Sequence, residues 1–359
     1  MVVGVEILCA VLAAAMFGAG HYLSGTASRR RGPVAVAYWT QFGVVAVALT
    51  LLLVQPAEGW DLTALLWGGV AALGGVVGSL CLYAALSRAT FTLAVGASTV
   101  TTTVTPALVA LIFLGEQASP LRLALVGLSM LTVWLLVSQK RGEGVAVVTS
   151  PLPVITGPIS VVDGDGQADS GGAGHAQGQV RGGTQSGRAQ SRSQSGEQSP
   201  TPGARSSSRS GLGAAALPLA AGLGYAVELV GVAQIPQQSF TQGLAAWAVA
   251  SLAVMLAVFM VRGGGTSAAR RSRLVPRGRD GALVVLAGGF SGAGMMLFHL
   301  SAAGIGLATT SAVVAVYPAV PILLAVAILR ERPSPRGWAG LACAAVVVAL
   351  GALSTVLQG

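Results

Sequence analysis

The sequence reads PALVALIFLGEQASP from Pro106 to Pro120 and PILLAVAILRERPSP from Pro321 to Pro335. Five residues of the first segment, Pro106, Leu114, Glu116, Ser119 and Pro120, recur in the second at one offset of 215 residues, the separation of Pro106 and Pro321. Five matches at a single offset indicate an internal repeat, a feature that many membrane transporters share. We therefore expect the chain to consist of two related halves.

The composition indicates a membrane protein. Hydrophobic residues make up 53% of the 359 residues and charged residues 9%, whereas an ordinary soluble domain carries about 25% charged residues. The apolar residues fall in runs that match the roughly 17 to 25 residues needed to cross a bilayer. The predicted fold is an all-α integral membrane protein with ten transmembrane helices in two five-helix repeats. The ten spans are expected at residues 2–24, 34–54, 64–86, 91–114, 121–138, 212–232, 239–261, 281–303, 307–329 and 337–357.

A polar segment separates the two groups of spans. Gly, Ser, Gln, Arg and Pro dominate residues 139–211, and such a composition cannot bury enough apolar surface to offset the entropy lost on ordering. We predict a disordered linker there. It joins a first five-helix half at residues 1–138 to a second one at residues 212–359.

The arginines indicate how the halves lie in the membrane. Because each half has an odd number of spans, the second half starts on the opposite side, so the repeat is inverted. Thirteen arginines lie in the loops after spans one, three, seven and nine, and the other loops outside the linker hold only Arg122. The positive-inside rule then places these loops and the linker in the cytoplasm and both termini outside. The net charge of +9 is thus juxtamembrane, and no nucleic-acid partner is expected.

Two segments resemble a known transporter family. LGEQASP at residues 114–120, preceded by Pro106 and repeated as LRERPSP at residues 329–335, resembles the EamA half-repeat of the drug/metabolite transporter (DMT) superfamily. Residues 17–30 are similar to the first span of a bacterial subgroup of that superfamily, which commonly has an acidic residue where His21 stands. The resemblance covers nearly the whole chain apart from the linker.

The resemblance implies ten helices, a central cavity between the halves, and transport of amino acids, sugars, nucleotides or drugs. It also implies cytoplasmic termini, the opposite of what the arginines indicate. Its signature residues, which we interpret as structural, are Pro106, Glu116, Pro321 and Glu331.

Ionisable residues within the spans are the first candidates for function, because a charge in a bilayer is costly and faces the bundle interior or a water-filled path by default. Glu228 lies well inside the sixth span. It is interpreted either as a carboxyl that exchanges protons or as a ligand for a cationic group, and the structural alternative is a neutral carboxyl held by a hydroxyl. His21 and His299 are the histidines within spans; they suit proton coupling, although a lone histidine inside a helix bundle is more often a packing residue.

Hydroxyl groups of the fourth span are the second set of candidates. Thr99, Thr102 and Thr103 share one helix face at three-to-four spacing, and Pro106 frees carbonyl groups nearby. Freed backbone is tolerated where it lines a cavity or is satisfied by protein. Threonine hydroxyls also bond carbonyls of their own helix, which is the structural alternative. The candidate pathway residues are Glu228, His21, Tyr22, Tyr225, Thr99, Thr102, Thr103, Tyr317 and His299.

These features favour a secondary transporter that moves a small metabolite or drug-like solute across the bacterial cytoplasmic membrane by alternating access, with proton coupling through Glu228 as a hypothesis. Two alternatives stay open, a non-transporting scaffold or sensor that uses the linker, and a membrane-embedded enzyme. The sequence offers no clustered catalytic groups for an enzyme. The three cysteines, in apolar runs, have no metal-ligand spacing, so no metal or cofactor is expected. The expected partners are the lipid bilayer, the solute and protons, and the expected state is a monomer or homodimer.

Overall fold

The structure, a computed structural model, describes residues 4–56, 59–88, 91–137, 211–263, 278–320, 322–323, 326 and 334–358. Every regular element in these ranges is a helix, as the sequence predicts. The described helices belong to one compact unit, which comprises residues 1–152 and 209–359. They are α1 (Val5–Arg31), α2 (Pro33–Val54), α3 (Leu62–Arg88), α4 (Phe91–Ile112), α5 (Pro120–Val137), α6 (Gly211–Ala233), η1 (Gln237–Ser239), α7 (Phe240–Gly263), α9 (Arg279–Ile305), α10 (Leu307–Val314) and α12 (Pro335–Gln358).

Seven helices in the described part of the chain are long and apolar enough to cross a membrane. They lie in α1, α2, α3, α6, α7, α9 and α12, and two shorter apolar helices, Ala97–Ile112 and Pro120–Leu136, lie in α4 and α5. Length and composition therefore mark the chain as a multi-pass membrane protein. The count of ten spans and the inverted repeat stay predictions, and the predicted linker lies outside the described residues except for Gly211, where α6 begins.

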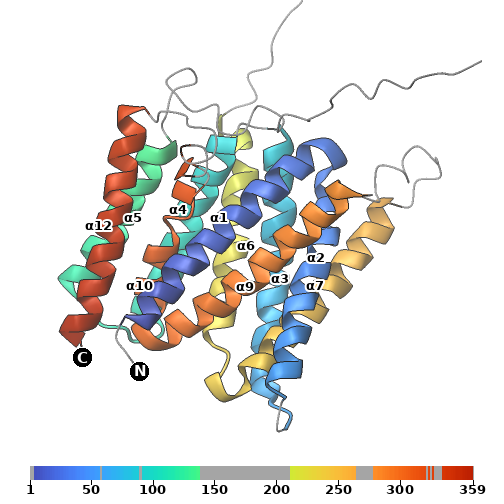
Figure 1. Cartoon of the computed structure of the whole chain (residues 1–359), viewed down its shortest axis with the longest axis horizontal. Coiled ribbons are helices and arrows are strands. Elements are labelled where there is room, and N and C mark those ends of the chain that lie inside the picture. Colours follow the sequence, from blue (N-terminus) through green and yellow to red (C-terminus); the bar gives the residue numbers. More distant parts are fainter. Residues whose placement is uncertain are drawn as a thin grey trace, which may run out of the picture. The chain divides into compact units, whose positions relative to one another are not determined.

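The helices pack in pairs whose members are far apart in the sequence. α3 lies against α6 and α7, and α9 lies against α1 and α2. Figure 1 shows α12 beside α5 at one side of the bundle and α7 beside α2 at the other. Each of these pairs joins a helix that ends before residue 138 to one that begins at residue 211 or later. Both parts of the chain thus build a single bundle.

Glycines allow the helices of these pairs to approach closely, as in many membrane bundles. At the contact of α2 with α9, a Cβ atom on Gly288 would overlap the carbonyl oxygen of Thr40, and one on Gly43 would overlap the carbonyl oxygen of Val285. At the contact of α3 with α6, a Cβ atom on Gly224 would lie 2.5 Å from the backbone nitrogen of Gly78. These contacts are between backbones and leave no room for a side chain.

α1 is longer than the first predicted span, which ends at residue 24. The helix continues to Arg31 and ends at Gly32, whose φ of 89° favours glycine. The predicted loop arginines, residues 29–31, therefore lie on the last turn of α1. Nη2 of Arg31 donates a hydrogen bond to Oδ2 of Asp280, in the first turn of α9, at 2.9 Å. This pair connects the adjoining ends of the two helices.

The ninth span is not the continuous helix predicted at residues 307–329. α10 ends at Val314, and residues 315–318 form turns. Pro318 has no N–H group with which to continue the helical hydrogen bonds. The amides of Val316 and Tyr317 donate instead to the carbonyl groups of Val313 and Val314, three residues earlier. The helix is therefore interrupted beside Tyr317.

Candidate functional site

A cavity lies within the bundle, and the empty space between its lining residues, open solvent included, is about 780 Å³. α1, α2, α3, α4, α6, α7, α9 and α10 all contribute to its wall. Both halves of the chain therefore line it. The lining residues are Phe17, His21, Thr40, Gln41, Val44, Gly75, Ser79, Tyr83, Thr102, Tyr225, Glu228, Leu229, Trp247, Ser251, Ser291, Met295, Val314 and Tyr317.

Glu228 of α6 provides the carboxyl group of this cavity. The residue is 6% exposed, and the indole N–H of Trp247, on α7, donates a hydrogen bond to its Oε1 at 3.0 Å. Gly75 of α3 faces the same carboxyl, since a Cβ atom on Gly75 would lie 2.7 Å from Cδ of Glu228. Three helices thus fix the position of the carboxyl group, and the missing side chain of Gly75 provides its space.

His21 of α1 lies between two tyrosine rings. The centroid of its ring is 5.6 Å from that of Tyr225 and 5.1 Å from that of Tyr317. The Tyr317 hydroxyl lies 2.7 Å from Oγ1 of Thr99 on α4, so this hydrogen bond ties the interrupted ninth span to the first half of the chain. The arrangement places a protonatable ring and a carboxyl group in one cavity.

The electrostatics of the cavity follow from its composition. Among the lining residues that the structure describes there is one carboxyl group and neither lysine nor arginine. The other titratable side chains are His21, Tyr83, Tyr225 and Tyr317. The described residues also contain no group of three His, Cys, Asp or Glu that could hold a metal ion. The cavity can therefore exchange protons, form hydrogen bonds and bind a cationic or aromatic group.

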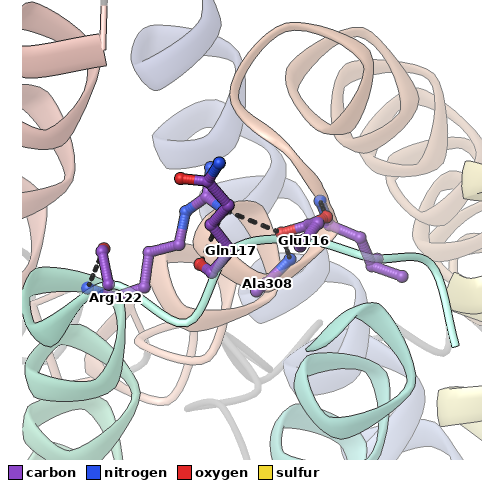
Figure 2. Close-up of polar contacts among 6 residues, drawn as sticks. Glu116, Gln117, Arg122 and Ala308 are labelled. Atoms are coloured by element: carbon purple, nitrogen blue, oxygen red, sulfur yellow. Dashed lines mark hydrogen bonds and ion pairs between the residues drawn. The ribbon is translucent and has the colours of Figure 1, made fainter. Parts of the chain in front are cut away.

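The short helix α10 is held in place at its start by Glu116, a signature residue from the first half of the chain. The amide of Leu307 donates to Oε1 of Glu116 at 2.6 Å, and the amide of Ala308 donates to Oε2 at 3.4 Å. Figure 2 shows the Glu116 carboxylate beside the backbone of Ala308. The side chain of Arg122 extends toward the loop that contains Glu116 and Gln117. A carboxylate here satisfies unpaired amides and complements the positive end of the helix dipole. Glu116 therefore positions the helix whose last residue, Val314, lines the cavity.

We expect Glu116→Ala to lower the free energy of unfolding by about 1 to 2 kcal/mol, because it leaves the first amides of α10 without their cap. Glu116→Gln keeps an acceptor oxygen and is expected to cost less. Thermal or denaturant unfolding of the purified protein measures both. Gln117→Ala is the matched control, since this neighbouring side chain is exposed. Equal losses in Glu116→Ala and Gln117→Ala would contradict the capping role.

Of the nine pathway residues predicted from the sequence, five line the cavity, and they are His21, Thr102, Tyr225, Glu228 and Tyr317. Thr99 contacts Tyr317 from α4. Of the signature residues, Pro106 lies inside α4 and Glu116 caps α10, whereas Pro321 and Glu331 lie outside the described residues.

The other three predicted residues lie elsewhere. The Thr103 hydroxyl donates to the Thr99 carbonyl oxygen of its own helix at 2.9 Å. Tyr22 borders a separate, smaller pocket beside the Arg31–Asp280 ion pair. The ring of His299 stacks on Phe240 at 4.0 Å, and its Nδ1 lies 3.0 Å from the carbonyl oxygen of Val232. The Thr103 hydroxyl is thus bonded within its own helix, and His299 is packed within the bundle with its Nε2 buried and without a hydrogen-bond partner among the described residues.

Sequence reasoning missed the residues of α3 that line the cavity. Gly75, Ser79 and Tyr83 follow one another at four-residue spacing and face the cavity together. The signal that could have identified them is the recurrence of polar and aromatic side chains at this four-residue spacing in an otherwise apolar helix. Glycine is so frequent in this chain, with 50 residues, that Gly75 alone could not be singled out.

Comparisons with known proteins concern the fold. No family model matches the chain, and no curated protein matches it. One solved structure that does match carries only the description "Crystal structure of protein"; the two chains are 15% identical, and the match covers 98% of this chain and 96% of that chain with a TM-score of 0.59. At this identity the likeness shows a shared fold alone.

Proposed function

We propose that the protein is a secondary transporter that moves a small solute across the membrane by alternating access, with the cavity as its binding site. In this proposal the chain has ten spans in two inverted halves, and Glu228 exchanges protons during transport. The resemblance of residues 114–120 and 329–335 to the EamA half-repeat of the DMT superfamily agrees with this function.

The pairing of the helices supports the inverted repeat. If the halves correspond, α1 matches α6, α2 matches α7 and α3 matches α9. The contacts of α3 with α6 and α7 then have the same form as the contacts of α9 with α1 and α2, and all four are present. Equivalent packing of this kind lets one half rearrange against the other around a central site.

The position of Glu228 carries the proposal. It is a carboxyl group within a membrane bundle, in a cavity whose wall comes from both halves of the chain. Intramembrane carboxyl groups facing a cavity are typical of solute and proton paths. The interruption of the ninth span beside the same cavity adds a second transporter feature, because broken helices often form such binding sites.

Thiol labelling from each side of the membrane tests alternating access. Cys9, Cys81 and Cys343 are first replaced by alanine, and Ser251, a cavity residue of α7, is then replaced by cysteine. In proteoliposomes of one orientation, a membrane-impermeant thiol reagent is expected to label Ser251→Cys from either side, because the cavity opens to each side in turn. The extent of labelling is measured by mass spectrometry.

Ser129→Cys in α5 is the matched control, because Ser129 is also buried but does not line the cavity. It is expected to stay unlabelled from both sides. Deleting residues 139–211 is expected to leave both results unchanged, whereas a scaffold that acts through this segment needs no access from two sides. Labelling of Ser251→Cys from one side only would contradict alternating access.

A further inference from the structure

The carboxyl group of Glu228 has no positively charged partner among the described lining residues of the cavity. Glu228 is 6% exposed, and its hydrogen bond comes from the neutral indole of Trp247. The described lining residues include no lysine or arginine to pair with it. An ionised carboxylate in such surroundings is costly unless a positive charge accompanies it. The cavity therefore requires either a proton on Glu228 or a cation beside it.

Aromatic rings supply the rest of the recognition surface. Five of them, Phe17, Tyr83, Tyr225, Trp247 and Tyr317, line the cavity with Glu228. Faces of aromatic rings attract organic cations, and the attraction grows when the cation is removed from water. A wall of this kind favours a cation with an apolar or aromatic body over a hydrated metal ion.

We propose that the cavity binds a monovalent organic cation with an aromatic or apolar body, whose charge pairs with Glu228 in place of a proton. This inference rests on the proposed function and names the class of its substrate. Binding to the protonated protein releases one proton: the carboxyl gives up its proton, and the carboxylate that remains pairs with the incoming cation. One carboxyl group thus serves the cation and the proton in alternation.

The direction of the pH dependence follows from the groups around Glu228. The titratable groups that face the cavity are His21 from α1, Tyr83 from α3, Tyr225 from α6 and Tyr317 after α10. Raising the pH ionises Glu228 and removes any proton from His21. Both changes favour a bound cation, so affinity is expected to rise with pH and then level off.

Binding to the purified full-length protein tests the proposal with two probes of similar size and opposite charge, phenyltrimethylammonium and benzenesulfonate. Isothermal titration is expected to show binding of the cation and a Kd that is roughly ten- to a hundredfold higher in Glu228→Gln, the range for a lost charge-assisted contact. Glu228→Asp retains the charge and is expected to keep part of the affinity. Glu6→Gln, which changes another buried carboxyl outside the cavity lining, is expected to leave the Kd unchanged.

Three results would overturn the proposal: no binding of the cation, equal binding of benzenesulfonate, or an unchanged Kd in a folded Glu228→Gln protein. Size-exclusion chromatography establishes that the variant is folded. The binding assay needs no transport, so it is independent of the labelling test. Two-sided labelling of Ser251→Cys together with charge-independent binding would overturn the cation proposal and leave the transporter intact. One-sided labelling of Ser251→Cys together with Glu228-dependent binding would overturn the transporter proposal and leave the cation site intact.

Discussion

Replacing Gly288 with alanine is expected to prevent α9 from packing against α2, whereas the same change at the next residue, Gly289, is expected to be tolerated. A Cβ atom on Gly288 would overlap the carbonyl oxygen of Thr40 and lie 2.7 Å from its carbonyl carbon. These are backbone atoms, which cannot rotate away as a side chain can. Overpacking of a core costs about 1 to 3 kcal/mol, and a backbone overlap belongs at or above the upper end of that range.

Gly289→Ala is the matched control for Gly288→Ala, because no heavy atom lies within 4 Å of a Cβ atom built on Gly289. Both residues are glycines in the middle of α9, so both lose the same backbone freedom. Gly289→Ala is expected to leave stability unchanged or to raise it by about 0.5 to 1 kcal/mol. The measurements are the yield of monodisperse protein and its thermal unfolding. Similar behaviour of the two variants would contradict the close α2–α9 contact.

The second large effect is expected at the cavity, where Gly75→Ala should disable the carboxyl site without unfolding the protein. A Cβ atom on Gly75 would meet the end of the Glu228 side chain, at 2.7 Å from Cδ. This group is flexible and can move aside, so the helices keep their contact. The carboxyl group, however, loses its place beside Trp247. The Kd of phenyltrimethylammonium is expected to rise at least tenfold, as in Glu228→Gln.

Gly69→Ala is the matched control for this second prediction, because it lies on the same helix and a Cβ atom there would have no neighbour within 4 Å. It is expected to keep the wild-type Kd. Thermal unfolding of Gly75→Ala should stay close to that of the wild type. A large drop in stability would show that the glycine maintains helix packing instead, and an unchanged Kd would show that the carboxyl group does not depend on this space.

The sequence predicted the features that depend on composition and periodicity. Long apolar runs located most of the helices within a few residues, apart from the end of α1 and the interruption after α10, and a lone carboxyl within a span singled out Glu228, which lines the cavity. Both signals are local. They need no knowledge of which helix lies beside which.

Features that depend on contacts between distant segments could not be predicted. Glu116 was expected to have a structural role, but its partner, the start of α10, lies 191 residues away in the sequence and could not be predicted. Which threonine borders the cavity was also undetermined: Thr102 lines it and Thr103 does not, although both hydroxyls donate to carbonyl oxygens of their own helix. The interruption after Val314 had a local cause in Pro318, but a proline inside a membrane helix need not end it, as Pro106 within α4 illustrates.

The close glycine contacts also determine how freely the sequence can change over evolutionary time. In the pairs Gly68–Gly69 and Gly288–Gly289, a Cβ atom would meet a neighbouring backbone only if it were added to the first member. The second member of each pair carries no such constraint and is open to replacement by larger residues. Neighbouring glycines that look equivalent in the sequence are therefore expected to tolerate different substitutions during evolution. Only some of the 50 glycines are required by the close packing of the helices.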